Sequence, residues 1–185
     1  MDGVPRGCPL RLTFADGKDL ERLVQELSQE DVLTALHSVL QEQCSEEFHR
    51  RWHDHQETWE GADPGPYIVA ALYSHVFVDA VKEMLQRTVA SEAKLADSVL
   101  RVLAVVEDLM QTGSREARGL VVVGFLEGVQ NIALNRGLDP TGIEPHLGQR
   151  TRRGWAWLNR IWSDKSTLAD VVRADVRGEL EEPDW

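Results

Sequence analysis

Cysteine is scarce in this chain. The 185 residues include two, Cys8 and Cys44, and neither stands in a Cys-x-x-Cys pair. Two cysteines are too few for a disulfide framework, so we expect two free thiols in a reducing compartment. The N-terminus also shows no basic segment followed by an apolar one, which is the pattern of a signal peptide. The sequence therefore predicts a cytoplasmic protein.

Long apolar runs and catalytic motifs are missing as well. The longest apolar stretch, 67–77, is interrupted by Ser74 and His75 and is too short to span a bilayer. There is no Gly-x-Ser-x-Gly, no phosphate-binding glycine-rich loop and no His-Glu-x-x-His. Cys44 precedes Ser45 and two acids, a setting that raises the pKa of a thiol. We therefore expect no enzyme activity, no cofactor and no membrane partner.

Basic residues are fewer than acidic ones, and the excess of acids is distributed unevenly along the chain. The formal net charge is −11. Residues 1–60 hold thirteen acids and six bases, residues 164–185 hold seven and three, and residues 61–163 hold eleven of each. Direct binding to nucleic acid is disfavoured, because contact with phosphates needs a basic field. The acidic ends would attract a basic protein, but acidity that only maintains solubility explains the same charge, and both interpretations stay open.

What the chain does have is helical periodicity. Its length and its 42% of hydrophobic residues suit one domain that folds without a disulfide or a metal. We predict an all-α fold, with an irregular lead-in over 1–15, a single helical domain over 16–163, and an acidic extension over 164–185 with room for one short helix. Stacked helical hairpins, arranged as a bundle or a short HEAT-like solenoid, fit the spacing of the segments between 66 and 136.

Several helix ends carry recognisable signals. Ser28 with Asp31 is a capping-box pattern, Pro66 suits a first helical turn, Ser114 suits an N-cap, and Gly137 suits a helix end. Apolar periodicity between such signals predicts the helices. The first predicted helix begins at about 16 or 19 and ends at about 27. The others cover about 28–40, 45–59, 67–88, 91–110, 115–135 and 150–162. A brief helix is also expected between 139 and 145, and another over 167–176.

The segment 115–135 is the most apolar. Its middle, Leu-Val-Val-Val-Gly-Phe-Leu over 120–126, would also suit a buried strand, but the flanks continue a helical pattern, so we predict a central buried helix. Gly124 and Gly128 stand four residues apart on one face, where we expect another helix to approach closely. Glu127 would need a partner if buried, and Arg101 or Arg118 is a candidate.

One helix face carries Glu46, His49, His53 and Glu57. Two histidines four residues apart can bind zinc, and Glu-x-x-His has the spacing used in di-iron bundles. No second Glu-x-x-His occurs, so we interpret this as a solvated polar face and expect no bound metal. His75, in an apolar helix, is expected to be a hydrogen-bonded structural residue.

Tryptophan occurs in two pairs with a seven-residue spacing, the spacing of one helix face. Trp155 and Trp162 form one pair, and Trp52 and Trp59 form the other. We expect both pairs to contact the core. Trp157 points elsewhere on its helix and is a freer candidate for a binding surface, because tryptophan is enriched among residues that dominate binding.

Four segments resemble an uncharacterised bacterial family of small acidic all-helical proteins. They read FHRRWHDHQETWE over 48–60, PYIVAALYSHVFVDAVKEML over 66–85, SREARGLVVVGFLEGVQN over 114–131, and PHLGQRTRRGWAWLNRIW over 145–162. The resemblance covers about 45–163, and its most specific piece is VVGFLE over 122–127. Such proteins look like immunity proteins of polymorphic or contact-dependent toxin systems, which bind and block a cognate toxin. The resemblance assigns no catalytic residues.

The resemblance and the charge together predict a protein-binding inhibitor, an immunity protein that neutralises its toxin in a stoichiometric complex. A toxin that acts on nucleic acid usually presents a basic cleft, which carboxylates can fill. We therefore expect the acidic region 16–60 to supply much of the partner surface. The predicted partner contacts are Glu42, Glu46, Glu47, Asp54, Glu57, Trp59 and Glu60.

Two other classes of function fit the same sequence. One is a helical metal-dependent enzyme, which would use the histidine face. The other is a structural or regulatory helical module that dimerises through exposed tryptophans. The oligomeric state and the identity of a toxin are open at this point.

Overall fold

The computed structural model describes residues 26–60, 62–86, 96–162 and 177. Over these ranges the fold is all-α, as predicted, and the β structure there is limited to one isolated bridge between Leu27 and Gly113. The helical elements are α2 (Gln29–Gln43), α3 (Ser45–Thr58), α4 (Pro66–Gln86), α5 (Asp97–Thr112), α6 (Arg115–Gly119), the π-helical segment η1 (Leu120–Leu126), α7 (Glu127–Asn135), the 3-10 helix η2 (Pro140–His146) and α8 (Gln149–Trp162).

Part of the prediction falls outside the described residues. This holds for the lead-in 1–15, most of the helix predicted to end near Leu27, the helix start at Ser91, and the extension 164–185 with its short helix. Leu27 itself is extended. Its N–H donates to the carbonyl of Thr112 (3.2 Å), and its own carbonyl accepts from the N–H of Ser114 (2.8 Å). These two bonds tie the entry into α2 to the turn between α5 and α6.

The capping signals work as predicted. The side chain of Ser28 accepts from the backbone N–H of Asp31, and the Asp31 carboxylate accepts from the N–H of Ser28 at 2.8 Å. The hydroxyl of Ser114 accepts from the N–H of Ala117 at 3.1 Å. Gly137 follows α7 with a φ of 69°, a left-handed conformation that glycine adopts without a steric penalty. Local chemistry therefore sets these helix boundaries.

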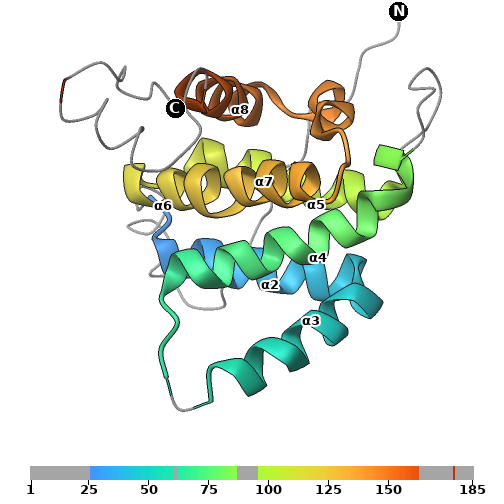
Figure 1. The fold of residues 1–185 in the computed structure, drawn as a ribbon. Helices are drawn as coiled ribbons and strands as arrows, with labels where there is room; N and C mark the ends of the chain where they lie inside the picture. The colour runs from blue at the N-terminus through green and yellow to red at the C-terminus, as the bar shows by residue number, and fades with distance from the viewer. Residues whose placement is uncertain (1–25, 61, 87–95, 163–176, 178–185) are drawn as a thin grey trace, which may run out of the picture.

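The helices lie in layers (Figure 1). At the top of that view are α8 and η2, below them α5 and the continuous α6–η1–α7, then α2 and α4, with α3 outermost at the bottom. The main partners of α4 are η1 and α7, and the main partner of α2 is α5. Helices distant in sequence thus pack together, as they do in a bundle.

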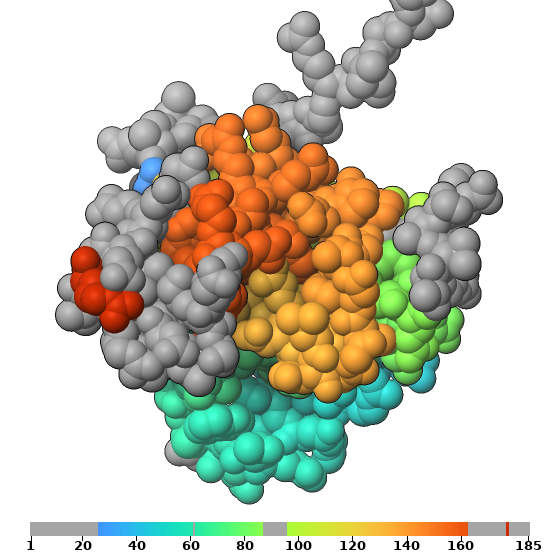
Figure 2. All heavy atoms as spheres, turned by 45° about the horizontal axis from the view of Figure 1, so that its top comes forward, coloured from blue at the N-terminus to red at the C-terminus, as the bar shows by residue number. Residues whose placement is uncertain are grey.

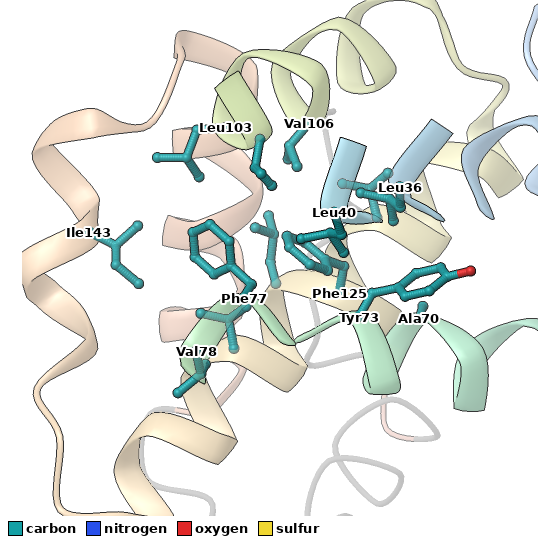
Figure 3. Close-up of a cluster of buried hydrophobic side chains, with 14 of the residues drawn as sticks. Leu36, Leu40, Ala70, Tyr73, Phe77, Val78, Leu103, Val106, Phe125 and Ile143 are labelled. Atoms are coloured by element: carbon teal, nitrogen blue, oxygen red, sulfur yellow. The ribbon is translucent and has the colours of Figure 1, made fainter. Parts of the chain in front are cut away.

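The core lies where α2, α4, α5, η1 and η2 meet (Figure 3). At its centre the rings of Phe77 and Phe125 pack edge to face, with centroids 5.7 Å apart. Such an arrangement suits the ring quadrupoles and adds to the gain from burial. The surrounding side chains drawn in Figure 3 include Leu36, Leu40, Leu103, Val106 and Ile143.

The apolar segment 115–135 is helical throughout, as predicted, but its middle is a π-helix. Over η1 the backbone N–H of Glu127 reaches back five residues to the carbonyl of Val122. By length and composition this is the one helix among the described residues that could cross a membrane, and 56% of its most apolar window is buried inside the protein. Burial of that extent is typical of a core helix.

The predicted close helix contact at Gly124 and Gly128 is confirmed, and its partner is α4. A Cβ at Gly124 would lie 2.8 Å from the Cβ of Ala70, and a Cβ at Gly128 would lie 2.9 Å from the Cβ of Ser74. The Ser74 hydroxyl donates to the carbonyl of Phe125 at 2.7 Å. The two glycines therefore let α4 come close enough for a hydrogen bond between a side chain and the neighbouring helix.

α8 carries three tryptophans, and one of them contacts Glu127 of α7. Trp155 is buried, as predicted, and Trp157 is half-buried against the core. The indole N–H of Trp162 donates to the carboxylate of Glu127 at 3.1 Å. The expectation of an arginine partner was wrong for Arg118, whose guanidinium donates to the carbonyl of Gly113 at 2.7 Å. Burial raises the pKa of Glu127, against the hydrogen bond from Trp162.

We expect Gly128→Ala to destabilise the protein by about 1 kcal/mol or more, because the new Cβ collides with Ser74 and strains its hydrogen bond. The matched control is Gly119→Ala, where a Cβ meets nothing within 4 Å. This control should be neutral or up to about 1 kcal/mol more stable, because alanine favours helix. Urea denaturation measures both. Equal effects of the two substitutions would contradict a tight contact at Gly128.

Candidate functional site

The outermost helix, α3, is held by an aromatic cluster that we define as His37, Phe48, Trp52 and Tyr73. Trp52 stacks on Phe48 and on Tyr73, with centroids 5.5 and 6.3 Å apart. His37, from α2, meets Phe48 and Trp52 edge-on at 4.9 and 4.8 Å. Its Nδ1 lies 3.2 Å from the Tyr73 hydroxyl. The aromatic cluster thus fixes one face of α3 against α2 and α4.

The predicted partner contacts lie on α3, which is at the bottom of the view in Figure 2, and at both of its ends: Glu42 lies in α2, and Trp59 and Glu60 follow α3. Five of the seven are exposed, namely Glu42, Glu46, Asp54, Glu57 and Glu60. Glu47 is half-buried, and so is Trp59, which lies 6.4 Å from the ring of His55. The segment from the end of α2 to just beyond α3 (42–60) therefore presents carboxylates outward, with one partly covered tryptophan. Their role in binding stays a prediction.

The histidine face is solvated. His49 and His53 are exposed, and the Nδ1 of His53 lies 3.7 Å from the Glu57 carboxylate, with both side chains about 70% exposed. The Nδ1 of His49 lies 3.4 Å from the Ser45 hydroxyl. Within the described ranges, no three His, Cys, Asp or Glu side chains are grouped closely enough to hold a metal ion. This face therefore lends no support to the metal-dependent alternative.

Both arginines of α3 turn toward a buried carboxylate on α4. Asp79 is 6% exposed, and its Oδ2 accepts from Arg50 Nη2 at 2.9 Å and from Arg51 Nε at 2.8 Å. Its Oδ1 accepts from Nη1 of Arg136, which follows α7, at 2.6 Å. We call Arg50, Arg51 and Arg136 the arginine cluster. It joins α3, α4 and the end of α7 through one carboxylate.

The charge on Asp79 is stable across the physiological range. Burial raises the pKa of this carboxyl, but hydrogen bonds from Arg51 and Arg136, together with their charges, outweigh it and lower the pKa from 3.8 to about 2. A buried carboxylate needs such partners, since its desolvation is costly unless it is paired and hydrogen-bonded. The three guanidinium groups of the arginine cluster supply this pairing.

His75 completes the arrangement as a neutral ring. Its Nδ1 lies 3.1 Å from Nη2 of Arg136. Arginine has only donors, so His75 Nδ1 must accept, and the ring proton stands on Nε2. Burial, followed by the charges of Arg51 and Arg136, lowers the pKa of His75, although Asp79 opposes them. The expectation of a hydrogen-bonded structural histidine is confirmed.

The two arginines of α3 pair with Asp79 and not with the acids that are closer to them in the sequence. Glu46 and Asp54 each stand four residues from Arg50, and Glu47 stands four from Arg51, which is the spacing that favours ion pairs on a helix. No such pair forms among the described residues of α3, where the ion pairs of the arginines lead to Asp79. The acids on the outer face therefore keep their charge uncompensated by the two arginines of their own helix.

Sequence reasoning missed the arginine cluster. Asp79 stands out as one of few acids inside the apolar helices, and an acid in that setting is expected to be paired. That signal points to the carboxylate but not to its partners, which lie 28, 29 and 57 positions away.

The thiol of Cys44 is buried and unreactive in character. Burial, and then the charge of Glu47, raises the pKa of Cys44 to about 11. The acids that follow this cysteine in the sequence predict the same direction. Cys8 lies outside the described residues.

We expect Asp79→Asn to destabilise the protein by about 3 kcal/mol at pH 7, because it leaves three guanidinium groups without their shared carboxylate. The wild type should also lose about 2 kcal/mol as the pH falls from about 4 to about 2, since the folded-state pKa of Asp79 is depressed. Thermal melts from pH 7 to pH 2 would show the stability gap between wild type and variant closing in that window. A stability gap between wild type and variant that stays constant over this pH range would contradict the assignment of the depressed pKa to Asp79.

Comparison with known proteins places the chain in a family. The model of a domain of unknown function, DUF7674, matches residues 39–163. Searches of curated proteins and of solved structures give no match. The matched range runs from the last turn of α2 through α8, so it contains the arginine cluster and all seven predicted partner contacts. The chain belongs to the DUF7674 family.

Proposed function

We propose that this chain is a protein-binding inhibitor of the immunity type, which neutralises a bacterial toxin by covering a basic surface with the outer face of α3. The observation that carries the proposal is the group of exposed carboxylates on that helix, none of which pairs with its two arginines. Arg50 and Arg51 pair with Asp79, while Glu46, Asp54 and Glu57 stay exposed. The helix thus presents three carboxylates to a partner, while Arg51 and the half-exposed Arg50 each use one nitrogen on Asp79.

Rigid anchoring of α3 supports the same proposal. The stacked rings of Phe48, Trp52 and Tyr73 fix the helix on one side, and the ion pairs with Asp79 fix it on another. An interface on a fixed helix loses less conformational entropy when it binds than one on a loop. Trp59, half-buried directly after α3, supplies an aromatic group of the kind that dominates binding energy.

The expected partner is a basic protein, bound one to one without any chemical step. Carboxylate pairs of this kind mainly raise the association rate and fix the register of the complex, and they weaken with salt over a Debye length of about 8 Å at physiological ionic strength. A cytoplasmic toxin with a basic nucleic-acid cleft has the complementary charge. The competing explanation is that the acids only keep the protein soluble.

The triple variant Glu46→Lys, Asp54→Lys, Glu57→Lys separates these two explanations. The partner to be used in the assay is the product of any toxin-like reading frame found directly upstream of the gene. We expect association at low salt to slow by about tenfold or more, with the fold unchanged by circular dichroism. Stopped-flow or surface plasmon resonance gives the rate, and growth during co-expression with the toxin reports protection.

The matched control is Glu83→Lys, Asp97→Lys, Asp108→Lys. It changes the net charge by the same amount on exposed residues of α4 and α5, and it also includes one acid from a helix first turn. If both triple variants slow association equally, only the overall charge matters. If neither does, or if the wild type gives no protection, the outer face of α3 is not the inhibitory surface.

A further inference from the structure

We infer that the arginine cluster is a binding site for a small oxyanion, a phosphate or carboxylate group held by Arg50, Arg51 and Arg136. This inference is independent of the proposed inhibitor function, which uses the acids of α3. It starts from an imbalance of charge, because three guanidinium groups meet one carboxylate, and His75 beside them is neutral. The cluster carries two positive charges more than Asp79 offsets.

Arg50 and Arg51 have N–H donors that Asp79 does not use. Each guanidinium has five N–H groups. Arg50 uses Nη2 on Asp79 and Arg51 uses Nε, so the other nitrogens of these two residues have no acceptor among the described residues. They are not sealed inside the protein, because the Arg50 side chain is 54% exposed and no nitrogen of the less exposed Arg51 is both buried and without a partner. Free donors on two adjacent arginines therefore face solvent.

Because the Asp79 carboxylate is buried, the guanidinium groups lie on the solvent side of the arginine cluster. Asp79 is 6% exposed, whereas the side chains of Arg50, Arg51 and Arg136 are 54%, 31% and 29% exposed. An approaching anion therefore meets guanidinium groups and not the carboxylate behind them. Asp79 holds all three from the inside, and His75 holds Arg136 as well, so the cations are in place before a ligand arrives. Planar guanidinium forks match the oxygen pairs of carboxylate and phosphate groups.

The surroundings select a small ligand. Glu46, Glu47 and Asp54 stand within one turn of Arg50 and Arg51, and the whole chain carries a net charge of −11. That field repels a polyanion such as a nucleic acid at long range. A single phosphate or carboxylate group carries little charge and gains its binding energy at short range from charge-assisted hydrogen bonds. Weak binding, at about millimolar dissociation constants, fits such an exposed site.

Inorganic phosphate and acetate are the probes, each measured against sodium chloride at equal ionic strength. We expect phosphate or acetate to raise the melting temperature of the wild type above that in chloride, because a ligand that binds only the folded state stabilises it. Arg50→Gln should weaken the affinity by about tenfold or more, as removal of one charge-assisted partner does. The matched control, Arg101→Gln, removes an exposed arginine of α5 and should leave the affinity unchanged.

Asp79→Asn gives a readout that a purely structural cluster would not give. Asparagine keeps an oxygen that can accept from the arginines but removes the negative charge, so phosphate should bind about tenfold more tightly and restore part of the lost stability. If the variant does not fold, the comparison of Arg50→Gln with Arg101→Gln decides. The tighter of the two probes identifies the group as phosphate or carboxylate. Equal effects of phosphate, acetate and chloride on the wild type, or equal responses of Arg50→Gln and Arg101→Gln, would overturn the inference.

Discussion

The close approach of α4 to the helix α6–η1–α7 is the constraint on which the other contacts depend. Gly124 and Gly128 remove the side chains that would separate the two helices, and Ser74 uses the space to donate to the carbonyl of Phe125. Once α4 is seated there, Phe77 meets Phe125 in the core. The rest of α4 then faces α2 and α3, where it presents Tyr73 and Asp79.

Asp79 links the position of α4 to the position of α3. Desolvation penalises a carboxylate at this depth, so the fold is stable only with cations at hand, and two of the three come from α3. Their ion pairs with Asp79 help to hold α3 in its rotation about its axis. Phe48 and Trp52 then fall on the inner side, and the acids fall on the outer side. The buried charge of Asp79 and the aromatic cluster together hold α3 in the rotation that leaves its acids exposed.

The sequence predicted the features that depend on neighbouring residues and missed those that depend on distant ones. The capping box at Ser28, the end at Gly137 and the close contact at Gly124 follow from local spacing. The π-helical turn over 120–126 carries no comparable local signal. Neither do the partners of Asp79 and Glu127, because an arginine or an indole is brought to a carboxylate by the packing of whole helices.

The two charged surfaces around α3 act over different distances, so they need not compete. The acids of the outer face sum with the net charge of the chain into a field that extends about a Debye length, roughly 8 Å at physiological ionic strength, and a basic protein responds to that field before contact. The arginine cluster acts through hydrogen bonds of about 3 Å, which only a ligand already at the surface can reach. Under the two proposals, the carboxylates of α3 attract a basic protein at long range and its arginines bind a small anion only on contact.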